Sequence, residues 1–190
     1  MWDKGEAMPD SEESFEEVRV AGDCLYDGKI LRLEVDTVRL PDGTEAVREV
    51  IRHPGAAVMV PVADDGTVLF VRQFRYPTGE HLLELPAGKL DPGEAPESCA
   101  ARETAEETGW RPDFVRPLGE FFTAPGFSDE LIRAFVVSGL RRDADAVRDA
   151  DELVEVRALS LAEFDELLNS GRIRDAKTIS AIALWRASAP

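Results

Sequence analysis

The sequence predicts an α+β protein in which strands outnumber helices. Apolar residues alternate, or form short continuous runs, in many segments bounded by Asp-Gly, Pro or Gly, which is typical of strands. Helical patterns are few: one lies among the strands and two lie near the C-terminus. With 190 residues, of which 44% are hydrophobic, the chain is long enough for one domain and an appendage.

The appendage is predicted at the N-terminus. Residues 1–16 are acidic and polar, and we expect a disordered tail there. Residues 17–52 alternate and contain two Asp-Gly pairs, at 27–28 and 42–43, which are strong hairpin signals. Three strands in so short a segment cannot build a core alone, so we expect this antiparallel β-meander to pack on a neighbour. Its predicted strands span residues 17–25, 29–39 and 45–52.

The main domain is expected to cover residues 53–190, beginning with a His-Pro-Gly turn. The continuous apolar run 56–62 indicates a buried strand. Ser160 and Glu163 form a capping box before one helix, and Asp175 can cap the last helix. Residues 141–151 are charged and irregular. The predicted strands are 56–62, 67–74, 82–85, 114–123, 131–138 and 153–159.

The charge and the cysteines exclude some partners and locations. The formal net charge is −16, from 38 acidic and 22 basic residues, which disfavours nonspecific binding to nucleic acid or anionic membranes. A run of about twenty apolar residues is missing, so no membrane span is predicted, and the N-terminus lacks the pattern of a signal peptide. Cys24 and Cys99 match no metal-binding or redox spacing. Reduced thiols are therefore expected, which indicates a cytoplasmic protein.

Residues 88–110 are the most informative segment, because a glycine-rich loop there becomes a helix of about thirteen residues. Pro96 fits the first helical turn, where a missing N–H costs nothing. Gly109 suits a left-handed C-cap. Trp110, just beyond the helix, is expected in the core.

Three carboxylates are predicted to share one face of this helix, because Glu103, Glu106 and Glu107 stand at positions i, i+3 and i+4. Like charges at this spacing repel, and a bound cation would relieve the repulsion. Carboxylate oxygens are hard ligands that select Mg²⁺, Mn²⁺ or Ca²⁺ over Zn²⁺. The alternative interpretation is a solvated acidic face, which would be favoured if the glutamates stood alone.

The flanking residues decide between these interpretations, because the glutamates belong to a longer pattern with fixed spacing. The fixed positions are Gly88, Glu94, Arg102, Glu103, Glu106, Glu107 and Gly109. This pattern resembles the signature box of the Nudix hydrolases, with Thr104 as a small departure at a loosely aliphatic position. The resemblance implies the Nudix fold, a mixed β-sheet flanked by helices, and hydrolysis of a nucleoside diphosphate linked to another group.

The same resemblance assigns the metal site. It implies that Glu103 and Glu107 bind Mg²⁺, for which Mn²⁺ can substitute, and that Glu106 is a third ligand or acts through water. The backbone carbonyl of Ala87 is expected as a further ligand, because the residues before the box resemble the turn of one branch of the family. An ion pair between Glu94 and Arg102 is expected to brace the loop.

Segments outside the box resemble the ADP-ribose pyrophosphatase branch, in which a similar meander helps to build a homodimer. They are residues 53–56, 72–75 and 124–130. Arg75 is expected at a rim, where its guanidinium could fork onto a phosphate, with a surface arginine as the alternative. Arg48 is a weaker candidate of the same kind. The loop 124–130 supplies Phe127 as a candidate to line the ribose pocket, with local packing as the alternative, and Ser128 as a further candidate for substrate binding.

A base for the attacking water is expected in the acidic segment before the last strand, where the resembling branch carries one. Asp151 and Glu152 are the candidates, with an exposed acidic loop as the alternative, and Glu106 completes the predicted catalytic set. The predicted reaction is Mg²⁺-dependent hydrolysis of ADP-ribose to AMP and ribose 5-phosphate. The alternatives are another nucleotide substrate, or a non-catalytic domain that senses ADP-ribose. Such sensing domains usually lose box glutamates, and here all are present.

Overall fold

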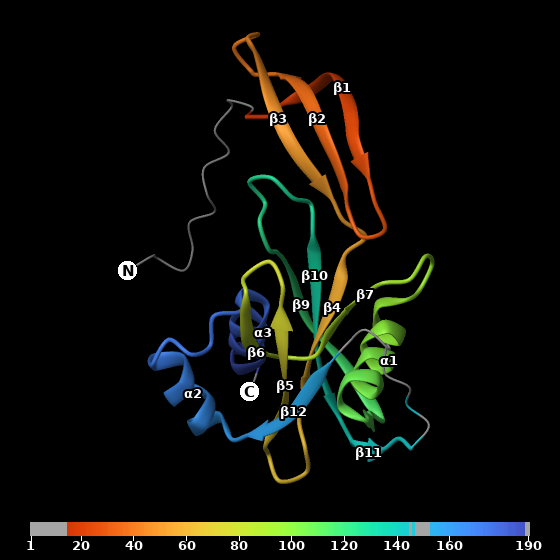
Figure 1. Ribbon diagram of the computed structural model, residues 1–190, viewed down its shortest axis with the longest axis vertical. Helices are drawn as coiled ribbons and strands as arrows, with labels where there is room; N and C mark the ends of the chain where they lie inside the picture. Colours follow the sequence, from red (N-terminus) through yellow and green to blue (C-terminus); the bar gives the residue numbers. More distant parts are fainter. Residues whose placement is uncertain (1–14, 145, 147–152, 189–190) are drawn as a thin grey trace. The chain divides into compact units, whose positions relative to one another are not determined.

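The computed structural model describes residues 15–144, 146 and 153–188, and its contacts divide the chain into two units, 1–52 and 53–190. The first unit contains three strands: β1 (Val18–Asp27), β2 (Arg32–Arg39) and β3 (Glu45–Arg52). They pair antiparallel in the order β1-β2-β3 (Figure 1), which confirms the predicted meander.

The meander has little interior of its own. Every residue of β1 is exposed, and Asp36 and Val38 are its buried residues within the described part of the unit. Ion pairs cross its strands: the Nε of Arg19 lies 2.8 Å from the Oδ1 of Asp36, and the Nε of Arg52 lies 2.9 Å from the Oε2 of Glu34. Backbone pairing and ion pairs therefore hold this sheet together more than apolar packing does.

The second unit is built on a mixed sheet with the order β7-β4-β10-β9. β4 and β10 pair parallel, whereas β9 and β7 pair antiparallel with their neighbours. A second, antiparallel sheet has the order β12-β5-β6, and β8 and β11 form a short pair. The strands are β4 (Ala56–Pro61), β5 (Val68–Arg75), β6 (Glu80–Glu84), β7 (Ala87–Lys89), β8 (Trp110–Arg111), β9 (Phe114–Phe122), β10 (Leu131–Ser138), β11 (Arg141–Arg142) and β12 (Val154–Leu159).

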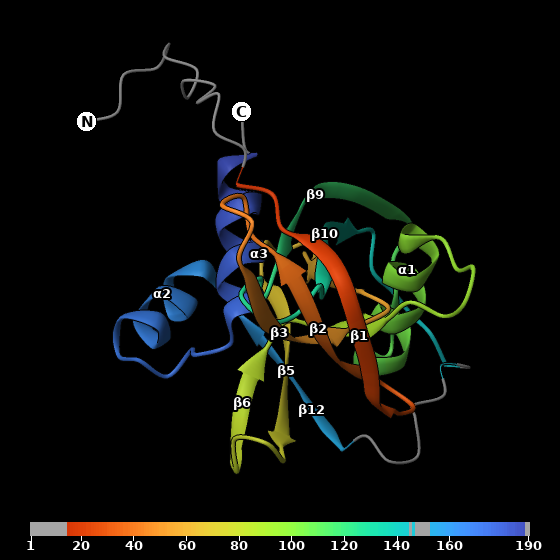
Figure 2. The same cartoon turned by 90° about the horizontal axis from the view of Figure 1, so that it is seen from above.

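Three helices in the described residues cover this unit: α1 (Pro96–Thr108), α2 (Leu161–Asn169) and α3 (Ala176–Ala187). The capping box before α2 is confirmed, because the Ser160 side chain accepts from the Glu163 N–H and the Glu163 side chain accepts from the Ser160 N–H. Asp175 caps α3 as predicted, accepting from the Thr178 N–H at 3.0 Å. Figures 1 and 2 show α1 on one side of the mixed sheet, with α2 and α3 on the other.

The core lies on both faces of β4, which is buried at every position, as its continuous apolar run predicted. Alternate residues face opposite ways, so Val58 packs in the cluster that contains Phe164 of α2, while Met59 packs in the cluster that contains Cys99 of α1. The rings of Phe70 and Phe164 stack with centroids 5.6 Å apart. The helix α1 thus packs on one face of β4, and the opposite face of β4 packs against the cluster that contains α2.

A few local expectations were wrong. Trp110 is only half-buried, and the guanidinium carbon of Arg142 lies 5.4 Å from its ring centroid. That contact accompanies the pairing of β8 with β11, so the segment expected to be irregular begins with a short strand.

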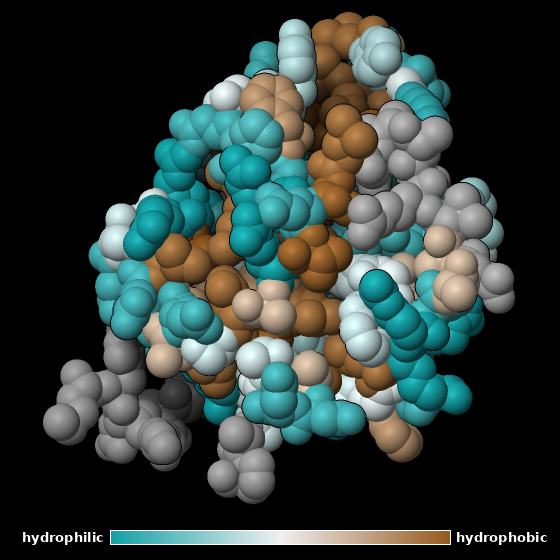
Figure 3. All heavy atoms as spheres, turned by 60° about the horizontal axis from the view of Figure 1, so that its bottom comes forward, coloured by the Kyte–Doolittle hydropathy of each residue, from teal (hydrophilic) through white to brown (hydrophobic). Residues whose placement is uncertain are grey.

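On the face shown in Figure 3, hydrophilic side chains are interspersed with hydrophobic ones. In the described part of the chain, no helix combines the length and apolar character needed to cross a membrane.

Candidate active site

The site begins where the loop after β7 becomes α1. Pro96 occupies the first turn, and Gly109 is the C-cap in the left-handed conformation, with φ of 76°. Its N–H donates to the Ala105 carbonyl at 2.8 Å, satisfying a backbone acceptor of the last turn. Both predicted ends of the helix are confirmed.

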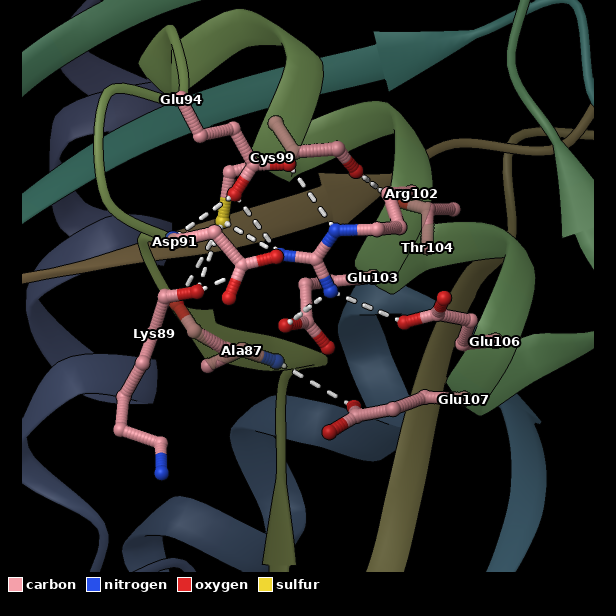
Figure 4. Close-up of polar contacts among 12 residues, drawn as sticks. Ala87, Lys89, Asp91, Glu94, Cys99, Arg102, Glu103, Thr104, Glu106 and Glu107 are labelled. Carbon is pink, nitrogen blue, oxygen red and sulfur yellow. Dashed lines mark hydrogen bonds and ion pairs between the residues drawn. The ribbon is translucent and has the colours of Figure 1, made fainter. Parts of the chain in front are cut away.

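Arg102 lies at the centre of the acidic cluster (Figure 4). Its Nε and Nη2 donate to the two carboxylate oxygens of Glu94 at 2.9 and 2.8 Å. Its Nη1 donates to Glu103 at 2.7 Å and to Glu106 at 3.0 Å. The hydrogen bond from Arg102 is the main reason that the pKa of Glu94 falls from 4.5 to about 2, and it raises the pKa of Arg102. The predicted brace between Glu94 and Arg102 is confirmed.

Glu103 and Glu107 both reach the strand that precedes the loop. A Cβ on Gly88 would lie 1.8 Å from the carboxylate carbon of Glu103, so this carboxylate rests directly on the glycine. Glu107 is 4% exposed and accepts a hydrogen bond from the Ala87 N–H at 3.2 Å. Glu103 and Glu107 therefore lie next to the backbone of Ala87 and Gly88, the segment that carries the predicted carbonyl ligand.

The donor set fits a hard divalent cation, because Glu103, Glu106 and Glu107 supply carboxylate oxygens from one helix (Figure 4). As the side chains lie, no group of three acidic, His or Cys side chains among the described residues is arranged to hold a metal ion. Glu103 and Glu106 are turned toward Arg102, whose single positive charge offsets part of their negative charge. To join Glu107 around an ion, they would need to rotate toward it, whereas Glu107 is already held by the Ala87 N–H.

Buried residues behind the cluster form its floor. Thr104, the departure from the family pattern, is fully buried, and its hydroxyl donates to the Ala100 carbonyl at 2.6 Å. Its polar group is thus satisfied within the helix. The Cys99 thiol lies 3.5 Å from the Lys89 carbonyl, and burial is the main reason that its pKa rises to about 12. A thiol so protected from ionisation is a packing group rather than a nucleophile.

The Arg75 side chain is 38% exposed, as the predicted place at a rim requires, and it is also paired with a neighbouring strand. It ends β5, but its guanidinium folds back onto Glu84 of β6, with Nε and Nη2 at 2.8 and 2.6 Å from the two oxygens. The hydrogen bonds to Glu84 raise the pKa of Arg75, and the nearby charges of Glu107 and Asp175 act in the same direction. The structure therefore brings this cation within electrostatic reach of Glu107.

The other candidates for substrate contact belong to other segments of the chain. Arg48 belongs to the meander, where its Nε lies 2.8 Å from the Oε2 of Glu17. Phe127 is 56% exposed, and the Ser128 hydroxyl accepts from the Glu130 N–H at 3.2 Å. The base candidates Asp151 and Glu152 lie outside the described residues, as does most of the predicted N-terminal tail.

The sequence reasoning did not select Glu84, which is fully buried. The Nζ of Lys177 on α3 also donates to it, and Lys177 lies 2.8 Å from Asp175. A charged residue in the apolar run 82–85 was the available signal, because buried carboxylates need partners. The identity of the partners could not be read, since Lys177 is distant along the chain.

Comparison with known proteins places this geometry among relatives. A model of the NUDIX domain matches residues 52–182, and a model of the nucleoside diphosphate sugar hydrolase N-terminal domain matches residues 25–51. A solved structure described as an ADP compounds hydrolase superposes with a TM-score of 0.79 at 21% identity, covering 90% of this chain and 93% of that one. This likeness bears out the predicted fold class.

Curated relatives cover most of the chain. The ADP-ribose pyrophosphatase of Bacillus subtilis (strain 168) is 39% identical over 170 residues, which are 89% of this chain and 92% of that protein. The methanol dehydrogenase activator of Bacillus methanolicus is 38% identical over 169 residues, 88% and 91% of the two chains. The GDP-mannose pyrophosphatase of Yersinia enterocolitica serotype O:8 is 38% identical over 144 residues, 71% and 75%.

Proposed function

The chain belongs to the NUDIX family, and from that premise we propose that it hydrolyses ADP-ribose to AMP and ribose 5-phosphate with the help of Mg²⁺. The observation that carries the proposal is that the Glu103 carboxylate lies against Gly88 and the Glu107 carboxylate accepts from the Ala87 N–H. The chain is also similar to an ADP-ribose pyrophosphatase over most of its length. Nudix ADP-ribose pyrophosphatases depend on a metal in general, and hard oxygen ligands suit Mg²⁺ or Mn²⁺.

Each residue near the helix has a proposed part in this reaction. Glu103, Glu107 and the Ala87 carbonyl would hold the metal, with Glu106 as a third carboxylate. When bound, Mg²⁺ neutralises phosphate oxygens, polarises the phosphorus and lowers the pKa of a bound water. Arg102 keeps Glu94 and the loop in place, which fixes the backbone that carries the carbonyl ligand.

The substrate and the water need further groups. Arg75 is proposed to bind the diphosphate, since a guanidinium offers donors that match phosphate oxygens. Phe127 and Ser128 are proposed contacts for the ribose, and Arg48 is a weaker candidate for contact with substrate. Asp151 or Glu152 is proposed to take the proton of the attacking water, with Glu106 assisting from the helix.

The test is a product assay on the full chain. Incubation with ADP-ribose and Mg²⁺ should release AMP and ribose 5-phosphate in equal amounts, identified by mass, and EDTA should abolish the release. Absence of AMP with Mg²⁺ present would reject ADP-ribose as the substrate. Metal-independent release would reject the proposed metal site.

A second substrate is favoured by one comparison, the match to a GDP-mannose pyrophosphatase. GDP-mannose cleaved at its diphosphate would yield GMP and mannose 1-phosphate at the same metal site. A panel of both substrates compared by kcat/KM separates the two proposals. A domain that only senses ADP-ribose would bind it without turnover in either assay.

We further propose that the chain forms a homodimer through its meander and works in the cytoplasm. The exposed apolar side chains of Val18, Val20 and Val47 support the first part, because apolar surface on a small sheet is a candidate for burial by a partner. The free thiols of Cys24 and Cys99 support the second part.

A further inference from the structure

Glu84 is a buried carboxylate that pairs with cationic side chains from two other elements. It ends β6, is fully buried, and accepts from both Nε and Nη2 of Arg75 on β5. On its other side, the Nζ of Lys177 on α3 donates to one of the same oxygens. Burial raises the pKa of Glu84, but the hydrogen bonds and charges of Arg75 and Lys177 outweigh this effect, and the net pKa is lowered. The carboxylate is therefore held in its charged form.

The register of the sheet shows that Arg75 and Glu84 do not stand opposite each other on the paired strands. Arg75 stands opposite Glu80, whereas Glu84 stands opposite Val71. Both residues lie on the same face of the sheet, but Arg75 must run back along the strands to reach Glu84. The ion pair thus moves the guanidinium away from the strand end and toward the region of Glu107, whose charge acts on it.

The paired hydrogen bonds from Arg75 to Glu84 leave other N–H donors of the guanidinium available to a further acceptor. Only Nε and Nη2 donate to Glu84, and no acceptor within the described part of the chain takes a hydrogen bond from Nη1. The Arg75 side chain is 38% exposed, compared with 1% for Glu84. A guanidinium that is fixed by one carboxylate and remains partly exposed is suited to bind a second anion.

Stability alone is a weak explanation for such a cluster. Replacement of buried ion pairs by apolar residues of similar volume is often neutral or stabilising, so elements can be joined without them. The apolar contacts of Leu85 and Ile182 already join these elements in one cluster. Two cations, Arg75 and Lys177, are balanced by two carboxylates, Glu84 and Asp175, so that the cluster is neutral before any substrate arrives.

We propose that Glu84 is a positioning residue that aims the guanidinium of Arg75 at the diphosphate of the substrate, with Lys177 holding Glu84 from the α3 side. This inference rests on the proposed function, since it assumes a diphosphate at the metal site. Glu84 itself touches no substrate, because it is fully buried beneath the two cations.

The test compares three variants of the full chain. Glu84→Gln keeps the shape of the side chain but removes its charge, and Arg75→Lys keeps the positive charge but removes the fork. The matched control is Glu155→Gln, because Glu155 on β12 pairs with Arg72 of the same strand β5, at 3.4 Å in an exposed position. Circular dichroism and thermal melting verify the fold of each variant.

Two measurements are made on each variant: kcat and KM with Mg²⁺, and binding of intact ADP-ribose by calorimetry in EDTA. We expect Glu84→Gln to lower kcat/KM by about ten- to a hundredfold, the usual effect of removing a partner that orients a site residue. Its affinity in EDTA should also fall. Arg75→Lys should lose a similar factor, and Glu155→Gln should match the wild type.

The outcomes separate this inference from the proposed function. If the wild type turns over no nucleoside diphosphate sugar, the proposed function fails. If the wild type is active and folded Glu84→Gln retains its KM and its affinity in EDTA, the inference fails. If Glu84→Gln does not fold, the decision rests on Arg75→Lys. Wild-type affinity of this variant for ADP-ribose would overturn the inference, and a loss of about ten- to a hundredfold would support it.

Discussion

At the scale of single residues, the candidate site is a set of four glutamates, three of which pair with one arginine. Arg102 contacts Glu94, Glu103 and Glu106, while Glu107 is held separately by the Ala87 N–H. The four glutamates therefore have different tasks, although they lie within one loop and one helix. Substitutions that keep the shape but remove the charge can separate these tasks.

Glu107→Gln should remove activity while leaving the fold intact. The amide oxygen can still accept from the Ala87 N–H, so the free energy of unfolding should change by less than about 1 kcal/mol. Turnover should fall by more than about a hundredfold, because even partners that only orient metal ligands cost ten- to a hundredfold. Steady-state kinetics with ADP-ribose measures this loss, and Glu97→Gln on the exposed side of the same helix is the control. Unchanged turnover would argue against the metal role of Glu107.

Glu94→Gln should change the response of stability to acid. Arg102 depresses the pKa of Glu94 in the folded state from 4.5 to about 2, so its contribution is present above pH 4.5 and is lost as the pH falls toward 2. At neutral pH the variant should be less stable by about 1 to 2 kcal/mol, allowing for the partial exposure of the pair. Urea denaturation across this pH range should show the two curves converging in acid. A constant gap between them would contradict the assignment.

At the scale of elements, β7 and α1 meet so closely that one position tolerates only glycine without moving a ligand. A Cβ on Gly88 would lie 1.8 Å from the carboxylate carbon of Glu103. That carboxylate is the end of a flexible side chain, so it can move aside without disturbing the backbone. The cost of a larger residue should therefore appear in metal binding more than in stability.

Gly88→Ala should weaken Mg²⁺ activation by about ten- to a hundredfold, because a Cβ at position 88 displaces the Glu103 carboxylate. Its melting temperature should stay close to that of the wild type. The control is a double-mutant cycle with Glu103→Ala: if Gly88 acts only through Glu103, the double variant should behave like Glu103→Ala alone. Additive increases in the concentration of Mg²⁺ needed for activity would count against this explanation.

At the scale of the whole molecule, the chain combines a main unit that has its own core with a meander that has almost none. The core clusters lie on the two faces of β4, whereas every residue of β1 is exposed. A small sheet with so little buried apolar area has limited stability of its own. This contrast motivates the proposal that a second copy covers the meander.

Val47→Asp should disrupt the proposed homodimer. Val47 is 63% exposed, so the charge should cost the isolated chain little, but burying it against a partner would be costly. Light scattering coupled to size-exclusion chromatography of the full chain should show a dimer for the wild type and a monomer for the variant. Phe114→Asp, at a position 68% exposed in the main unit, is the control and should remain dimeric. A monomeric wild type would refute the proposal.

Local patterns were sufficient for much of the site. Pro96, Gly109 and the spacing of the glutamates predicted both ends of α1, and the brace between Glu94 and Arg102 followed from the box. These features depend on residues within one or two turns of each other, so the order of the amino acids specifies them directly. The same holds for the capping box of α2.

The sequence by itself therefore determined the family, the α+β class, the meander, the site helix and the residues with metal-ligand chemistry. The tertiary structure decided which distant residues meet: β10 beside β4, and Lys177 on a carboxylate 93 residues away. It also paired the guanidinium of Arg75 with Glu84, a contact that the sequence pattern did not indicate. The physical reason is that a buried charge must find its partners in three dimensions, and chain neighbours do not reveal which ones the packing will supply.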